Sequence, residues 1–191
     1  MLTIDAVMRL APVIPVIVID DAAAARALAE HLVATGMVAL EVTLRTPAAL
    51  DAIAEMGAVP GAVVGAGTVL NEAQLDAAIA AGAQFIVAPG LTDRLARAAI
   101  ERGIPFLPGV ATAGDIMRGL DLGLDRFKFF PAVASGGIPA LKALSAPFGT
   151  ARFCPTGGIT AATAPDWLAL PSVVCVGGSW MMPTTGIAAQ R

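Results

Sequence analysis

The sequence predicts an α/β protein, a single (β/α)8 (TIM) barrel domain over residues 1–191. Short runs of apolar, β-branched and aromatic residues recur at even spacing, and segments rich in alanine and leucine lie between them. Several of the short runs are apolar on both faces, which is typical of parallel strands buried between helices and a core. A chain of 191 residues is long enough for one substantial core and too short for two ordinary domains.

Eight segments are predicted as strands: residues 13–18, 38–43, 62–68, 84–89, 104–109, 126–131, 151–158 and 172–179. A short helix within residues 2–10 is expected before the first strand. A doubly wound sheet is the alternative architecture, and it requires a reversal of strand order that a sequence does not reveal.

Helix-start residues precede the segments between the strands. They are Asp20 with Asp21, Thr46 with Pro47, Asn71 with Gln74, Thr92, Thr112 with Asp115, and Thr160. After the eighth strand only WMMPTTGIAAQR remains, which is too little for a loop and a normal closing helix. We therefore expect the last helix of the barrel to be missing or shortened.

Charge and hydropathy favour a cytoplasmic protein that binds neither nucleic acid nor a membrane. Fifteen acidic and twelve basic residues give a net charge of -3, whereas nucleic acids and anionic membranes require clustered lysine and arginine. The longest uncharged stretch, residues 167–190, is interrupted by Pro171, Pro183 and glycines, so it is not expected to span a membrane. The first ten residues contain Asp5 and no basic leader, so they do not resemble a secretory signal.

In a barrel of this kind the active site lies at the carboxyl ends of the strands. The polar and glycine residues at these ends are Glu41, Arg45, Thr68, Lys128, Thr156, Gly157, Gly158, Gly177, Gly178 and Ser179. Because side chains alternate along a strand, Glu41 and Arg45 point to one face, as do Lys128 and Phe130.

Lys128 is the first candidate for chemistry. It is one of only two lysines and lies within FKFF, where an amine is poorly hydrated and its neutral, nucleophilic form is favoured. A neutral amine can form a Schiff base with a carbonyl group. The alternative is a lysine whose stem is buried while its ammonium group extends to solvent.

Glu41 is the second candidate, because a carboxylate among apolar strand residues is costly unless it is paired or protonated. It could transfer protons at an imine or at a carbinolamine. The alternative is a structural ion pair with Arg45 or Lys128. The two roles are compatible, since a partner that holds the carboxylate also positions it.

The segments TGG and GGS follow the last two strands, where barrels often bind phosphate through backbone N–H groups. Tight turns that require left-handed residues are the alternative explanation for these glycines. His31, the only histidine, is predicted to lie within a helix, and no cluster has metal-site spacing, so neither a histidine-based triad nor a metal cofactor is expected. Cys154 and Cys175 are predicted to be small buried hydrophobic residues.

At these residues the sequence resembles the family of 2-keto-3-deoxy-6-phosphogluconate (KDPG) aldolases. The matching motifs are PVIPVIV, LEVTLRT, VVGAGTVLN, AGAQFIVAPGLT, RFKFFPA, RFCPTGGIT and CVGGSWM, which run in order from Pro12 to about Pro183. The resemblance implies a class I, metal-independent aldolase on a (β/α)8 barrel, usually a homotrimer, although the short C-terminus departs from the family.

The resemblance also implies roles for individual residues. Lys128 would form the Schiff base, Glu41 would be the general acid/base, and Arg45 and Thr68 would bind the carboxylate end of the substrate. Pro89 and Phe130 would line the pocket, and Thr156, Gly157, Gly158 and Ser179 would hold the phosphate end. The expected reaction is cleavage of KDPG to pyruvate and glyceraldehyde 3-phosphate, with 2-keto-4-hydroxyglutarate (KHG) as a related substrate. The alternatives are an aldolase for the galactonate epimer and a barrel that binds a phosphosugar without turnover.

Overall fold

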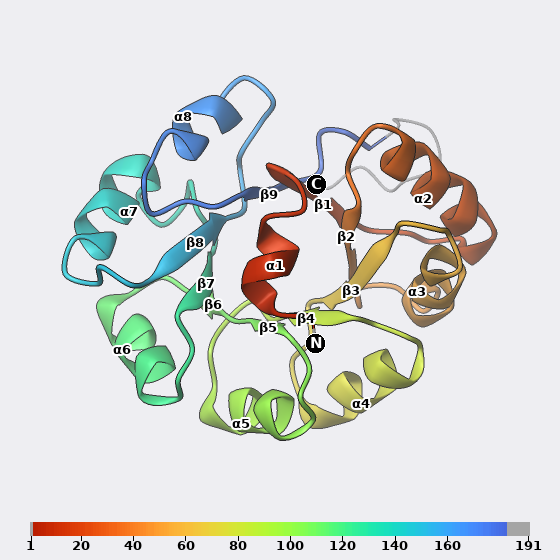
Figure 1. Ribbon diagram of the computed structural model, residues 1–191, viewed down its shortest axis with the longest axis horizontal. Coiled ribbons are helices and arrows are strands. Elements are labelled where there is room, and N and C mark those ends of the chain that lie inside the picture. Colours follow the sequence, from red (N-terminus) through yellow and green to blue (C-terminus); the bar gives the residue numbers. More distant parts are fainter. Residues whose placement is uncertain (1, 183–191) are drawn as a thin grey trace.

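The computed structural model describes residues 2–182 and shows parallel strands that curl around a common centre, with a single outer layer of helices (Figure 1). Its strands are β1 (Val13–Ile17), β2 (Ala39–Thr43), β3 (Val63–Gly67), β4 (Phe85–Val87), β5 (Phe106–Leu107), β6 (Gly109–Val110), β7 (Arg126–Phe129), β8 (Arg152–Pro155) and β9 (Val176–Gly178). All eight segments predicted as strands contain a strand. The predicted α/β class is therefore confirmed.

Six strands form one sheet in the order β5-β4-β3-β2-β1-β9, and β6-β7-β8 form a second. Every pairing is parallel, and two isolated parallel bridges, Phe153 with Val173 and Thr156 with Gly177, connect β8 to the region of β9. The predicted fifth strand is divided into β5 and β6 at Pro108, which has no N–H to donate to a neighbouring strand. The outer layer of helices differs from a doubly wound sheet, in which helices cover both faces.

The helices follow the strands in alternation. They are α1 (Ile4–Met8), the short 3-10 helix η1 (Ala22–Ala24), α2 (Ala25–Ala34), α3 (Ala49–Gly57), α4 (Glu72–Ala80), α5 (Asp93–Glu101), α6 (Ala113–Asp121), α7 (Gly137–Ser145) and α8 (Ala164–Leu168). None of the described helices has the length and apolar character needed to cross a membrane. The expectation of a missing or shortened last helix concerns residues after 182, which lie outside the described residues.

Four predicted helix starts are confirmed by side-chain caps. Asp21, Asn71, Thr92 and Thr112 each accept a hydrogen bond from a backbone N–H of the following turn. The prediction for Thr46 is wrong, because its hydroxyl donates to the carbonyl of Ile19 and α3 begins at Ala49 without a side-chain cap. Thr160 opens the turn that leads into α8, because its hydroxyl accepts a hydrogen bond from the N–H of Thr163 at 3.3 Å and the Thr163 hydroxyl accepts one from the N–H of Thr160 at 3.0 Å. The α-helix itself begins at Ala164.

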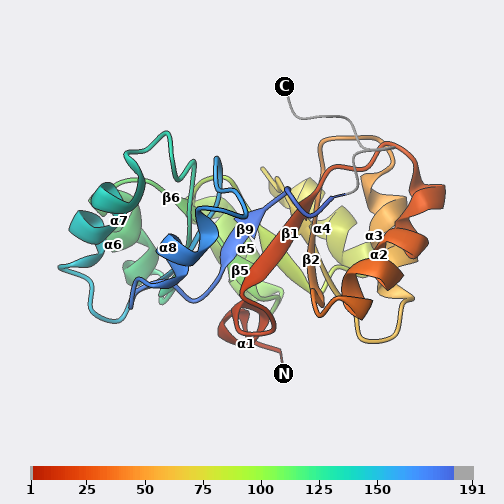
Figure 2. The same cartoon turned by 90° about the horizontal axis from the view of Figure 1, so that it is seen from above.

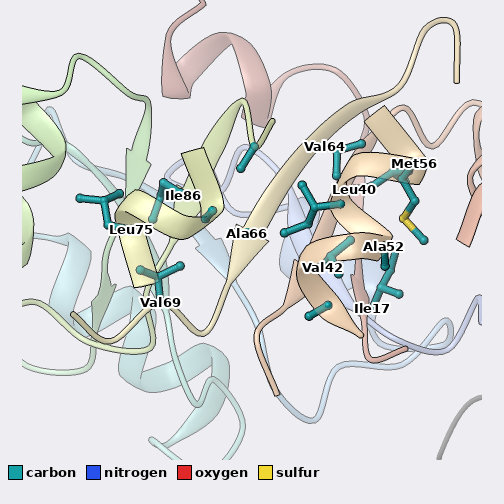
Figure 3. Close-up of a cluster of buried hydrophobic side chains, with 14 of the residues drawn as sticks. Ile17, Leu40, Val42, Ala52, Met56, Val64, Ala66, Val69, Leu75 and Ile86 are labelled. Atoms are coloured by element: carbon teal, nitrogen blue, oxygen red, sulfur yellow. The ribbon is translucent and has the colours of Figure 1, made fainter. Parts of the chain in front are cut away.

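The largest apolar core lies between the strands and the outer helices. Figure 3 shows Ile17, Leu40 and Val42 of β1 and β2 beside Ala52 and Met56 of α3, and all five are essentially inaccessible to solvent. Burying such side chains contributes about 1.5–3 kcal/mol each for valine, leucine, isoleucine and methionine. This outer core holds one face of each strand against the helices. The opposite face of each strand points toward the centre of the molecule.

The centre is closed at the amino ends of the strands by α1, which lies across that end of the molecule (Figure 2). Val7 and Met8 of α1 are fully buried against a cluster that includes Phe85 and Leu107. Asp5 of α1 also pairs with Arg9 and with Arg126 of β7 at 2.7 and 2.5 Å, and these hydrogen bonds lower the pKa of Asp5. The amino end is therefore occupied by packed side chains.

Cys154 and Cys175 belong to the same inner cluster, and both are buried free thiols, as predicted. The pKa of Cys175 is raised well above its ordinary value, first by its hydrogen bond with Cys154 and then by burial. Cys175 is therefore protonated near neutral pH and behaves as a small apolar residue.

Candidate active site

A buried ion pair between Lys128 of β7 and Glu41 of β2 lies at the centre of the molecule. The ammonium nitrogen Nζ of Lys128 lies 2.9 Å from Oε1 and 3.2 Å from Oε2 of Glu41. The two residues are only 5% and 3% exposed, so their charges are largely removed from water. They come from different sheets, and their side chains therefore meet across the interior of the curled strands.

The alternation of side chains along β7 produces this arrangement. Phe127 and Phe129 are fully buried in the outer core, where the ring centroid of Phe129 lies 6.4 Å from that of Trp167. Lys128, between them, consequently points inward. It does not extend to solvent, and its Nζ lies 5.3 Å from the ring centroid of Phe130.

The expected partner of Glu41 is also settled by the structure. Within residues 2–182, the carboxylate of Glu41 pairs with Lys128 and forms no ion pair with Arg45. Arg45 is exposed and lines a pocket that Lys128 also lines. Its guanidinium group is thus placed to meet a ligand.

This pocket brings together seven of the ten site residues predicted from the sequence. They are Arg45, Lys128, Phe130, Thr156, Gly157, Gly158 and Ser179. Glu41 does not line the pocket itself, but it contacts Lys128 directly. The walls of the pocket therefore carry the guanidinium group of Arg45, the amine of Lys128, and the segment Thr156–Gly158, which has a threonine hydroxyl beside two glycines.

Thr68 and Pro89 do not line this pocket. Thr68 follows β3 directly and has a φ of 59°, a left-handed conformation that is strained for a β-branched residue and is often found at functional sites. Pro89 follows β4 and is half-buried. Both lie at the carboxyl ends of strands, and their contact with a ligand remains a prediction.

The two glycine segments differ in conformation. Gly157 and Gly158 have φ values of 103° and 77°, so the turn after β8 requires glycine for its backbone, as the alternative explanation stated. Gly177 and Gly178 of β9 have no such φ values, and their missing side chains instead leave room for Thr156 and Trp180. Both segments line the pocket, so the backbone conformation does not exclude a role in phosphate binding.

The single histidine of the sequence lies away from this site. His31 is an exposed residue of α2 on the outer surface. No group of three or more histidine, cysteine, aspartate or glutamate side chains that could hold a metal ion occurs among residues 2–182.

Three residues at the site were not identified from the sequence. Val16 and Ile159 line the pocket, and Gly67 lies against the side chain of Glu41. Val16 and Glu41 are register partners in neighbouring strands. A pattern along one strand does not give this register, and the apolar or glycine character of the three residues carries no chemical signal of its own.

Comparison with known proteins places this geometry in a family. The family model described as "KDPG and KHG aldolase" matches residues 4–191. A 2-dehydro-3-deoxy-phosphogluconate aldolase of Zymomonas mobilis is 62% identical over 180 residues, which are 94% of this chain and 86% of the relative.

Two solved structures are closely similar. The 2-keto-3-deoxy-6-phosphogluconate aldolase of Zymomonas mobilis with 3-phosphoglycerate has a TM-score of 0.94 and 60% identity, and the match covers 96% of this chain and 88% of that one. The KDPG aldolase of Legionella pneumophila, with pyruvate captured as a covalent carbinolamine intermediate, has a TM-score of 0.92 and 48% identity. That match covers 96% of this chain and 89% of the other.

The fold, the buried amine and these relatives define a lyase, an aldolase of the class that uses a Schiff base. The chain belongs to the KDPG and KHG aldolase family. The resemblance seen in the sequence motifs is therefore confirmed.

Proposed function

We propose that this protein cleaves 2-keto-3-deoxy-6-phosphogluconate to pyruvate and glyceraldehyde 3-phosphate, with Lys128 as the nucleophile and Glu41 as the general acid/base. The observation that carries this proposal is the buried contact between Nζ of Lys128 and the carboxylate of Glu41 beside an open pocket. A carboxylate at 2.9 Å can accept a proton from the ammonium group, which leaves the neutral amine needed for attack on a carbonyl.

The reaction begins when the neutral amine of Lys128 attacks the C2 ketone of the substrate. The resulting carbinolamine loses its hydroxyl group as water, with a proton supplied by Glu41, and becomes a protonated imine. Glu41, directly or through a water molecule, then removes the proton from the C4 hydroxyl. The C3–C4 bond breaks, its electron pair moves into the imine, and glyceraldehyde 3-phosphate leaves with the new C4 aldehyde.

The pyruvate half remains attached to Lys128 as an enamine. Glu41 returns a proton to C3, which regenerates the imine, and water then attacks C2. Release of pyruvate restores the ammonium group of Lys128 and the carboxylate of Glu41. No metal is required, because the protonated imine withdraws electrons from the breaking bond.

The lining residues, together with Thr68 and Pro89 at the carboxyl ends of β3 and β4, provide groups for both ends of the substrate. We assign the substrate carboxylate to Arg45 and Thr68, and we place Pro89 and Phe130 against its carbon chain. Thr156, Gly157, Gly158 and Ser179 are assigned to the phosphate end. KHG shares the pyruvate half and differs only in the remote half, so it is expected to react more slowly by the same steps.

We expect Arg45→Lys to lower kcat/KM by about 10-fold or more, because a planar guanidinium group meets a carboxylate through two parallel hydrogen bonds and an ammonium group does not. The measurement is steady-state cleavage of KDPG by both proteins. Arg118→Lys, a change at an exposed arginine of α6 outside the pocket, is the matched control. An unchanged kcat/KM in Arg45→Lys would remove Arg45 from the proposed carboxylate site.

The experiment that tests the function is release of pyruvate from KDPG, from its galactonate epimer and from KHG, each with and without EDTA. We expect KDPG to be the preferred substrate and the rates to be unaffected by EDTA. Preference for the galactonate epimer would assign the alternative substrate. Binding of both phosphorylated substrates without pyruvate release would indicate a non-catalytic binding protein.

We also propose that residues 1–191 form one closed (β/α)8 barrel, that the protein assembles as a homotrimer and that it acts in the cytoplasm. The bridges between β8 and the region of β9 support barrel closure. The trimer follows from the family resemblance, and the location follows from the charge and hydropathy of the sequence. Sedimentation of the purified protein tests the trimer.

A further inference from the structure

Several strands carry glycine, among them β3, β6 and β9. Gly67 of β3 is one of these glycines, and it lies beside β2 in register with Thr43. A methyl group built on Gly67 would overlap Oε1, Cγ and Cδ of Glu41, and these are its three nearest heavy atoms. The space occupied by the Glu41 side chain therefore exists because residue 67 has no side chain.

We propose that Gly67 is a positioning residue for Glu41, because its missing side chain is what allows the carboxylate to lie against Nζ of Lys128. This inference rests on the proposed role of Glu41 as the general acid/base. Gly67 itself does not line the pocket and is not expected to touch the substrate.

Two features separate this role from an ordinary requirement for glycine. The φ of Gly67 is not in the left-handed region, so alanine can adopt the same backbone conformation. The three heavy atoms nearest to a methyl group at position 67 all belong to one flexible side chain, whereas at Gly109 the three nearest belong to the backbone. An alanine at position 67 can therefore be accommodated if Glu41 moves, and that movement takes the carboxylate away from Lys128.

The test is Gly67→Ala, assayed for KDPG cleavage. We expect kcat to fall by about 10- to 100-fold, a part of the 10²- to 10⁴-fold that a positioned general acid/base contributes. KM should change less than about threefold, because the lining of the pocket is retained. Exchange of the pyruvate methyl protons in D2O, which requires a base at the enamine, should slow by the same factor as kcat.

The matched controls use other glycines. Gly57→Ala at the end of α3, where a methyl group would meet open space, should leave kcat unchanged. Gly65→Ala, two residues earlier on the same strand, would instead overlap the ring of Phe85 and should lower Tm. A loss of kcat in Gly67→Ala that merely follows a loss of Tm, as in Gly65→Ala, would overturn the inference.

A double-mutant cycle separates this inference from the proposed function. If Gly67 acts through the carboxylate, Gly67→Ala should change kcat less than about twofold once Glu41→Gln is present. If the double variant instead shows the product of the two single-variant losses in kcat, the positioning role of Gly67 would be overturned. Full activity of Glu41→Gln alone would instead overturn the proposed function.

A second cycle applies if Gly67→Ala is too unstable to assay. Glu41→Ala removes the side chain that the new methyl group would meet. Gly67→Ala should then lower Tm in the wild-type background and leave Tm nearly unchanged in the Glu41→Ala background. An equal loss of Tm in both backgrounds would show that residue 67 does not act on Glu41.

Discussion

Lys128→Ala is expected to abolish KDPG cleavage, with kcat falling by about 10⁴-fold or more, because the variant has no amine to form the imine. Borohydride added with pyruvate should attach a stable adduct to one lysine of the wild-type protein and to none of Lys128→Ala. Peptide mass mapping should place the wild-type adduct on the fragment that contains FKFFPAVASGG.

Lys142 provides the matched control, since it is the only other lysine and lies exposed on α7. Lys142→Ala should retain both the adduct and full activity. An adduct on Lys142, or full activity of Lys128→Ala, would contradict the mechanism and leave the fold unaffected. The contrast is informative because Lys128 is buried beside the Glu41 carboxylate, whereas Lys142 is exposed.

The class and the order of the elements were predictable from the sequence because each depends on local patterns. The alternation of apolar strand segments with capped helices located all the strand segments, and the side chains of Asn71 and Thr112 cap helices as predicted. Thr46 was misassigned because its hydroxyl bonds to the carbonyl of Ile19 in a neighbouring strand region. That competing contact depends on tertiary structure, which a local pattern does not contain.

The candidate site was predictable to a similar degree and for a related reason. A charged residue in an apolar strand is conspicuous, so Lys128 and Glu41 were found from the sequence alone. Their contact across two sheets, and the separation of Arg45 from Glu41, required the three-dimensional arrangement of the strands. Val16 lines the pocket and Gly67 leaves space for the Glu41 side chain, and such contacts are seen only when the neighbouring strands are in place.

Glu41→Gln is expected to lower kcat by about 10²- to 10⁴-fold, because the amide keeps the size of the side chain but cannot accept and return a proton. Exchange of the pyruvate methyl protons in D2O should fall with kcat, since both require a base near C3. Glu55→Gln, on the exposed surface of α3, is the matched control and should retain full activity.

The same variant distinguishes the two roles considered for the carboxylate. Breaking a buried pair by removing one charge typically costs about 3–5 kcal/mol of stability when the other charge stays buried and unpaired. A purely structural carboxylate would therefore lower Tm in Glu41→Gln while the folded fraction kept its normal kcat. A catalytic carboxylate predicts instead that the folded protein completes few turnovers, and that the borohydride-trapped pyruvate adduct on Lys128 forms more slowly, because Glu41 supplies the proton for loss of water from the carbinolamine. Measuring Tm, the rate of adduct formation and kcat on one preparation decides between these roles, because a purely structural carboxylate changes only the fraction of protein that is folded.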